Sequence, residues 1–119
     1  EHRPALMYHF GVGQGRMTVS DLARLLAEQP AKLFGMYPQK GVLAVGSDAD
    51  IVLFDQNYTG SISSAAQYQN VDYTPYEGWA LRGRADTVLL SGQVAVEGGR
   101  VVLERQGRYV RRGPAGFWR

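Results

Sequence analysis

The 119-residue sequence contains no cysteine and only two histidines, and it has no long apolar run. Without cysteine the chain can form no disulfide, thiolate nucleophile or cysteine–zinc site. No apolar stretch approaches the ~20 residues that a membrane-spanning helix requires, and no secretory leader is visible. We therefore expect a cytoplasmic protein without a membrane partner, and its length fits one domain with one hydrophobic core.

Residues that commonly bind metals are scarce and scattered. The only histidines, His2 and His9, lie seven residues apart, which is not the spacing of one helical turn. Asp48 and Asp50 form an Asp-x-Asp pair, but the oxygen ligands that would complete a calcium loop do not follow. We predict no metal ligand among these residues, and a turn-capping and strand-entry role for the two aspartates.

The remaining candidate chemistry also favours structural roles. Asp72 and Glu77 could form a carboxylate pair, yet acids in turn-rich segments usually accept hydrogen bonds from loop amides. Residues 11–16 are rich in glycine but lack the spacing and the Lys-Ser/Thr pair of phosphate loops. No Gly-x-Ser-x-Gly motif marks a nucleophilic serine. The residues thus predict no catalytic, cofactor-binding or metal site in this chain.

Positive charge is unevenly distributed along the sequence. No lysine or arginine occurs between Lys40 and Arg82, whereas the last fifteen residues contain five arginines: Arg105, Arg108, Arg111, Arg112 and Arg119. We predict a solvated or subunit-contacting tail, because the basic stripe of a nucleic-acid-binding domain does not extend over the chain. The sequence also begins without an initiator methionine, which suits a piece of a longer protein.

The first third of the chain has the pattern of amphipathic helices. Thr18 and Asp21 occupy the two positions of a capping box, and leucines at positions 22, 25 and 26 predict one apolar helix face to about Glu28. The residue before a proline is disfavoured in the α region, so Gln29-Pro30 should end this helix. Pro30 can then open a second short helix that Gly35 closes.

The stretch from Gly41 to Asp55 is a glycine-punctuated turn followed by a nearly continuous apolar strand, residues 49–54. Both of its faces are apolar, which predicts a strand covered on both sides. We expect a long aromatic loop at 56–85, with a short strand near 61–63, to pack against the core. From Asp86 onward, turn residues separate three short strands at 87–90, 94–96 and 101–103, which predicts an antiparallel meander.

Three motifs in this order resemble the C-terminal part of the hydantoinase/dihydropyrimidinase family of cyclic amidohydrolases. They are Pro30-Ala-Lys-Leu-Phe-Gly-Met-Tyr-Pro-Gln-Lys-Gly41, Val45-Gly-Ser-Asp-Ala-Asp-Ile-Val-Leu-Phe-Asp55 and Val71-Asp-Tyr-Thr-Pro-Tyr-Glu-Gly78. The second motif is widespread among amidohydrolases, and the third narrows the resemblance to this branch. The resemblance extends over essentially the whole chain.

This resemblance implies an α+β fragment. Residues 1–40 would form a helical segment that packs on a (β/α)₈ barrel, residues 41–103 antiparallel strands of a β-sandwich, and residues 104–119 an arginine-rich tail that often meets neighbouring subunits in relatives. A barrel alone takes ~250 residues, so it would lie outside this chain. The family's binuclear centre, usually zinc, would lie there too.

The resemblance further implies a function for the intact enzyme, in which two metals activate a hydroxide that opens a hydantoin or dihydropyrimidine ring. We expect this chain alone to be inactive and to associate with the barrel and with further copies of itself. Three substrate branches stay open: hydantoinase, dihydropyrimidinase and allantoinase. The alternatives are a non-catalytic assembly module related to dihydropyrimidinases and, more weakly, a nucleic-acid binder that uses the arginine tail.

Overall fold

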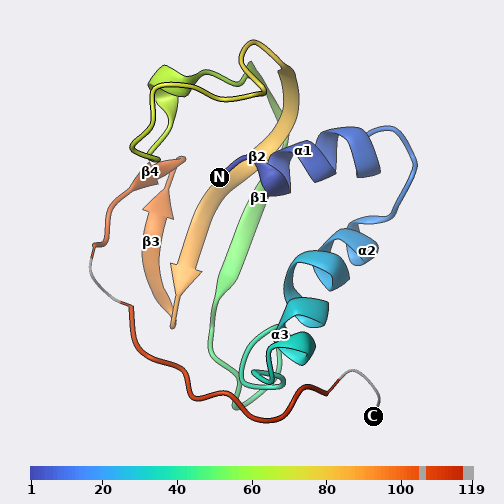
Figure 1. The fold of residues 1–119 in the computed structure, drawn as a ribbon, viewed down its shortest axis with the longest axis vertical. Coiled ribbons are helices and arrows are strands. Elements are labelled where there is room, and N and C mark those ends of the chain that lie inside the picture. Colours follow the sequence, from blue (N-terminus) through green and yellow to red (C-terminus); the bar gives the residue numbers. More distant parts are fainter. Residues whose placement is uncertain (105–106, 117–119) are drawn as a thin grey trace.

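A helical layer precedes and flanks a four-stranded antiparallel sheet in the computed structural model, which describes residues 1–104 and 107–116 (Figure 1). The helical elements are α1 (Arg3–Met7), the π-helical turn η1 (Tyr8–Val12), α2 (Val19–Ala23), the π-helical turn η2 (Arg24–Glu28) and α3 (Gln29–Leu33). The strands are β1 (Ile51–Ser61), β2 (Ala80–Leu90), β3 (Gln93–Glu97) and β4 (Arg100–Val101), and η3 (Ser64–Ala66) is a short 3₁₀ turn. The predicted α+β class, with helices first and antiparallel strands after them, is confirmed. The proposed division at residues 40 and 103 stays a prediction.

The helical layer meets the sheet at one tight aromatic contact. Tyr8 of η1 is buried, and its ring lies 4.8 Å from the ring of Phe54 on β1. Gly83 of β2 has a φ of +86°, and a Cβ there would lie 2.5 Å from Phe54 and 2.6 Å from Tyr8. Glycine therefore allows the two rings to rest directly on the backbone of β2. Nearby, the backbone N–H of Arg82 donates to Nδ1 of His9 over 2.9 Å, which ties η1 to the same strand.

The second helical run begins at the predicted capping box. The backbone N–H of Asp21 donates to the Thr18 hydroxyl over 3.1 Å, and the backbone N–H of Thr18 donates to the Asp21 carboxylate over 3.0 Å. The predicted break at Gln29-Pro30 is wrong, because Gln29 keeps helical angles and helical turns continue from Val19 to Leu33. The π-helical turn η2 ends at Glu28, two residues before Pro30, and shifts the hydrogen-bond register, which accommodates a residue without an N–H donor.

The four strands pair in the order β1-β2-β3-β4, and the predicted meander from Asp86 onward is present as β2, β3 and β4. The expected long loop at 56–85 is shorter, because β1 continues to Ser61 and β2 already begins at Ala80. The expected separate strand near 61–63 is the end of β1. An irregularity between Asp55 and Thr59 shifts the register with β2, so that a polar segment stays within the ladder.

The loop between β1 and β2, residues 62–79, contacts the N-terminal helical segment through Tyr76 and Trp79, and the expected packing of its aromatic residues against the core stays a prediction. Its base closes through Ile62, whose N–H donates to the Trp79 carbonyl over 2.9 Å and whose carbonyl accepts from Gly78 over 2.8 Å. The Trp79 ring lies 5.6 Å from Phe10 and 5.3 Å from Tyr76. Not all of its aromatics are inward, since Tyr73 is 70% exposed.

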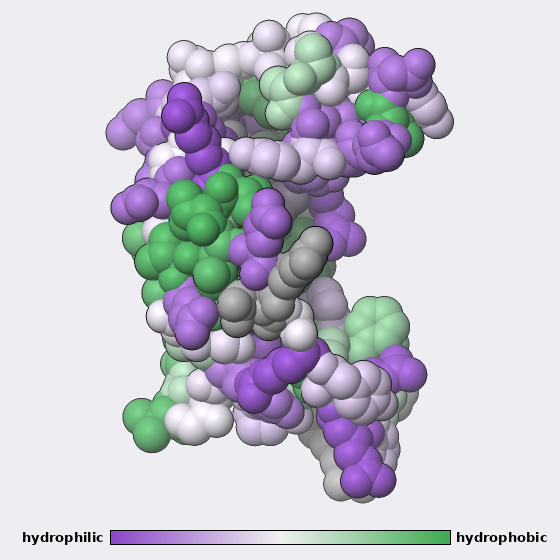
Figure 2. Space-filling view, turned by 90° about the vertical axis from the view of Figure 1, so that its left-hand side faces the viewer, coloured by the Kyte–Doolittle hydropathy of each residue, from purple (hydrophilic) through white to green (hydrophobic). Residues whose placement is uncertain are grey.

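Much of the sheet surface is apolar and exposed. Val52 and Leu53 of β1 are each 55% exposed, so the expected strand with both faces covered is not found within the described residues. Tyr8 of the helical layer covers Phe54, whereas the neighbouring Val52 and Leu53 of the same strand stay exposed. Hydrophobic side chains also gather on the face shown in Figure 2. Val94 of β3 and Val101 of β4 are likewise exposed. Within residues 1–104 and 107–116, no helix has the length and apolar character needed to cross a membrane.

Candidate functional site

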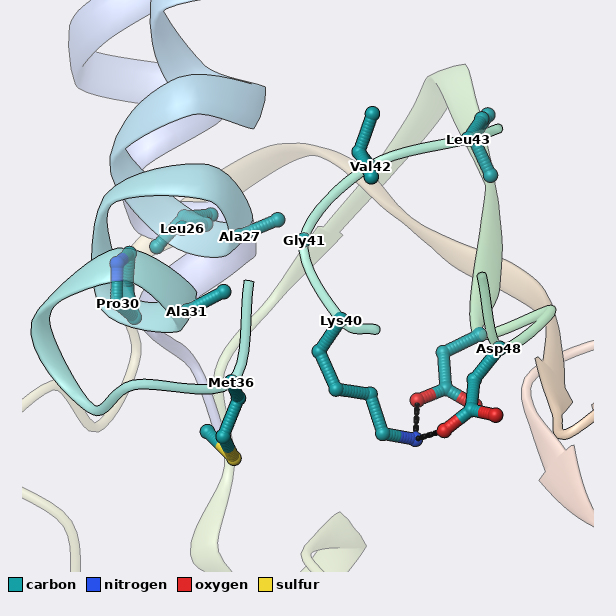
Figure 3. Close-up of a pocket in the computed structure, with 11 residues that line it drawn as sticks. Leu26, Ala27, Pro30, Ala31, Met36, Lys40, Gly41, Val42, Leu43 and Asp48 are labelled. Carbon is teal, nitrogen blue, oxygen red and sulfur yellow. Dashed lines mark hydrogen bonds and ion pairs between the residues drawn. The ribbon is translucent and has the colours of Figure 1, made fainter. Parts of the chain in front are cut away.

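The densest group of charged side chains surrounds Lys40, which lies in the connection between α3 and β1 (Figure 3). Its ammonium group lies 3.0 Å from Oδ2 of Asp48 and also contacts Oδ2 of Asp50. The two aspartates stand one residue apart just before β1, so their side chains can bracket a single cation. Arg108 of the C-terminal tail pairs with Oδ1 of Asp48.

Backbone and amide groups complete the shell of this ion-pair cluster, which we define as Lys40, Asp48, Asp50 and Arg108. Gln39 donates through its side-chain amide to Oδ2 of Asp48 over 3.2 Å, and the Gln39 carbonyl accepts from the Asp48 N–H over 2.9 Å. The Ser91 N–H in the β2–β3 turn donates to Oδ1 of Asp50 over 2.9 Å. The cluster thus joins four segments, and the predicted turn-holding role of the aspartates is confirmed by these contacts.

The protonation equilibria follow from these contacts. The hydrogen bond from Lys40, followed by that from Arg108, holds the pKa of Asp48 at about 2, below its ordinary 3.8. Burial alone would lower the pKa of Lys40, but the hydrogen bonds to Asp50 and Asp48 together outweigh it and raise that pKa. Asp48 and Lys40 are therefore both ionised at neutral pH. Two cations balance two carboxylates, so the cluster carries no excess charge that would attract an ion.

An apolar hollow of about 420 Å³ adjoins the cluster on the helical side (Figure 3). Its apolar wall comes from η2, α3 and the connection after α3, and includes Leu26, Ala27, Ala31, Met36 and Val42. Gly41 has a φ of +85°, and a Cβ there would lie 2.6 Å from the Ala31 side chain. The backbone of the connection therefore rests directly on α3, and the Lys40 side chain points from it toward the aspartates.

The two histidines have separate structural partners. His9 accepts from the backbone of β2, and His2 contacts the side-chain amide of Gln67 and lies 6.4 Å, ring to ring, from Tyr76. Within residues 1–104 and 107–116, no three histidine or acidic side chains come together as metal ligands would. The residues present here do not fit a metal centre.

Glu77 has the role that the sequence predicts, as an acceptor for loop amides. The Ser64 N–H donates to its carboxylate over 2.7 Å. This backbone hydrogen bond, helped by the side chain of Ser63, lowers the pKa of Glu77. Asp72 lies on an exposed part of the loop, and its predicted hydrogen bonding stays a prediction.

The arginine tail separates into engaged and exposed members. Arg108 belongs to the ion-pair cluster, whereas Arg111 and Arg112 are exposed. Arg105 and Arg119 lie outside the described residues. Sequence reasoning missed that Lys40 and Arg108 serve as the partners of Asp48. The sequence did contain a weak signal for Lys40, because it is the last cation before a long stretch in which every charged residue is acidic.

Comparison with known proteins assigns the family. Residues 1–95 match the Amidohydrolase family, so the chain belongs to the amidohydrolase family. It is 44% identical over 108 residues to a D-hydantoinase of Ralstonia pickettii, covering 90% of this chain and 24% of that protein. It is 37% identical over 117 residues to a D-hydantoinase of Geobacillus stearothermophilus, covering 98% of this chain and 25% of that protein.

Solved structures give the same result. A D-hydantoinase (dihydropyrimidinase) from Thermus sp. superposes with a TM-score of 0.93 at 42% identity, covering 98% of this chain and 26% of that one. The resemblance to hydantoinases and dihydropyrimidinases is thereby confirmed. The chain spans about a quarter of the length of the relatives that it matches.

Proposed function

We propose that this chain is part of a hydrolase that opens cyclic amides of the hydantoin or dihydropyrimidine type. The observation that carries the proposal is the match to the Thermus D-hydantoinase structure, because it combines 42% identity with near-complete coverage of this chain. The reaction class is addition of water across a ring C–N amide bond, which leaves a ring-opened acid. The curated relatives named D-hydantoinase support the hydantoin class of substrate.

In this proposal the chain supplies a structural platform, and other parts of the protein supply the reacting groups. Amidohydrolases are typically metal-dependent, whereas the carboxylates of the ion-pair cluster are already held by Lys40 and Arg108. The exposed apolar surface of β1 supports a role in packing against a larger body, for which a (β/α)₈ barrel is our proposal. The outer strands β1 and β4 also leave sheet edges, which favour association with further copies.

The proposal is tested by comparing this chain with the product of the complete reading frame. Both are incubated with zinc and then with hydantoin or dihydrouracil, and ring opening is followed by the loss of ultraviolet absorbance. We expect turnover only from the complete product. Ring opening by the 119-residue chain alone would contradict the platform role, and an inactive complete product with intact folding would contradict the hydrolase.

The exposed apolar sheet surface also fits a second function, a non-catalytic assembly module. The two functions differ in what the complete product does. An assembly module would bind its partners with unchanged affinity when zinc is removed, and it would leave both ring substrates intact. A hydrolase would lose ring-opening activity on zinc removal and regain it when zinc is restored.

A further inference from the structure

The outer edge of the sheet at β4 is apolar and lies at the surface. Val101 and Val102 are 43% and 55% exposed, and Leu103 follows them in the sequence. Residues of this kind favour extended structure, and an edge made of them is a template on which another strand can add. Charged side chains often protect such an edge, but residues 101–103 carry no charge. The edge therefore needs another form of protection.

The backbone of this segment presents one N–H group outward. The N–H of Val102 donates to the Ala95 carbonyl of β3 over 2.9 Å, so it faces the inside of the sheet. Successive N–H groups of a strand point to opposite edges, so the N–H of Val101 faces away from β3. An outward N–H at an edge is the group that the carbonyl of an added strand would bind.

Tyr68 of the loop between β1 and β2 occupies this outward position. Its hydroxyl accepts from the Val101 N–H over 3.3 Å, although the two residues lie 33 positions apart in the sequence. Figure 1 shows the loop reaching the end of β4. Tyr68 is 66% exposed, so its ring is not a core residue. The hydrogen bond to β4 accounts for the place of this side chain.

The loop is held in this place from its other side. The backbone N–H groups of Tyr68 and Gln69 donate to the Glu1 carboxylate over 3.0 and 3.2 Å. The side-chain amide of the neighbouring Gln67 contacts His2. These contacts tie the backbone of Tyr68 to the start of the helical layer, and hydrogen bonds to a carboxylate are among the stronger ones. The hydroxyl is therefore directed to β4 before any strand arrives.

We propose that Tyr68 closes the outer edge of β4 against strand addition. Its phenol oxygen accepts the hydrogen bond that the carbonyl of an added strand would otherwise accept. Covering an edge strand with a loop is a recurrent protection of sheets. With β4 closed, strand pairing between copies is directed to β1. This closure rests on the edge association in the proposed function, and it is independent of ring-opening activity.

The test uses single cysteines as reporters, because the chain has none of its own. Val102→Cys places a thiol on β4. Two copies that paired antiparallel around this residue would form a non-hydrogen-bonded pair with about 4.5 Å between the Cα atoms, a distance that a disulfide spans. Val101→Cys covers the register centred on the neighbouring residue. Val52→Cys places the same reporter on β1, where Val52 is 55% exposed.

Tyr68→Phe removes the hydroxyl and keeps the ring. Dimers that form in oxidised glutathione are quantified by non-reducing gel electrophoresis. Cross-linking through a cysteine on β4 should be about fivefold faster in Tyr68→Phe, the scale of one neutral hydrogen bond, and cross-linking through Val52→Cys should not change. Tyr73→Phe is the matched control, because it removes a hydroxyl from another exposed tyrosine of the same loop. It should leave all three reporters unchanged.

Hydrogen exchange of the Val101 amide gives a second readout that needs no association. Its protection should fall in Tyr68→Phe and not in Tyr73→Phe. Equal cross-linking on β4 with tyrosine and with phenylalanine at position 68 would overturn the closure of this edge, as would retained protection of the Val101 amide. An equal rise at Val52→Cys would also overturn it, because the whole chain would then have loosened, which circular dichroism would detect. Ring opening by the complete product is measured separately, so neither result decides the other.

Discussion

The ammonium group of Lys40 lies 3.0 Å from Oδ2 of Asp48 and also contacts Asp50, so one cation separates two carboxylates that precede the same strand. The Lys40 side chain is only 19% exposed, which places the contact in a region of reduced screening by water. Without the cation the two carboxylates would face each other, and the connection between α3 and β1 would lose its fixed course.

Lys40→Met tests this arrangement by removing the charge and keeping most of the apolar stem. We expect a loss of about 1–3 kcal/mol in the free energy of unfolding, because two charged hydrogen bonds are lost, Asp50 loses its cation and Asp48 keeps only Arg108. Urea unfolding measures the change. Lys32→Met is the matched control, since Lys32 pairs with a single carboxylate, Glu28, on the helix surface and lies 4.9 Å from the centre of the Tyr37 ring, so its loss should cost clearly less. Equal losses in the two variants would contradict a special role for Lys40.

The stability of the chain should also depend on the protonation of Asp48. Folding lowers its pKa from an ordinary 3.8 to about 2, so the folded state favours the ionised carboxylate. The contribution of the ionised Asp48 carboxylate to the free energy of unfolding is therefore complete above roughly pH 4, and it is lost as the pH falls through about 2. Unfolding curves between pH 5 and 2 should show a smaller decline of stability with acid in Asp48→Asn than in the wild-type chain. Parallel pH profiles of the two proteins would contradict this assignment.

The parts of the fold that the sequence predicts correctly depend on residues that lie close together in the sequence. The capping box needs only Thr18 and Asp21, and the tight turn before β3 needs only a few residues around Gly92. The continuous helical turns through Pro30 were not predicted, because a π-helical turn is a small shift in register without a sequence signature. The length of β1 was underestimated for a related reason, since pairing with β2 holds its polar end in the sheet.

The partners of Asp48 show why the candidate site could be predicted only in part from the sequence. The aspartates were correctly predicted to hold a turn, but Arg108 lies 60 residues away along the chain and reaches Asp48 only through the path of the tail. Nothing near either residue in the sequence indicates that contact. The family, by contrast, could be recognised from the motifs at 45–55 and 71–78, because such motifs preserve ancestry without revealing which contacts they make.

Thr18→Ala tests the start of the second helical run. It removes the hydroxyl that accepts from the Asp21 N–H, and we expect a loss of about 1 kcal/mol in the free energy of unfolding. Ser20→Ala is the control, because Ser20 is exposed inside α2, where alanine is the better helix former. Thermal unfolding should show a lower midpoint for Thr18→Ala and an equal or higher midpoint for Ser20→Ala. A stable Thr18→Ala variant would show that tertiary packing alone fixes this helix end.

The docking of the tail on α3 depends on the absence of a side chain at Gly35. Its φ is +66°, and a Cβ there would lie 2.0 Å from the Gly113 carbonyl oxygen. Gly35→Ala should therefore cost the usual 1–2 kcal/mol of a left-handed alanine and displace the tail as well. Gly15→Ala is the matched control, because Gly15 has a φ of +68° with nothing within 4 Å of the added Cβ.

Hydrogen exchange distinguishes the two effects of these glycine substitutions. The Gly113 amide, which donates to the Gly35 carbonyl over 2.7 Å, should lose its protection in Gly35→Ala and keep it in Gly15→Ala. Both variants should lose global stability, since both residues adopt left-handed angles. Retained protection of the Gly113 amide in Gly35→Ala would mean that the tail can shift to accommodate the methyl group. In that case the backbone contact with α3 would not be what holds the C-terminal tail in position.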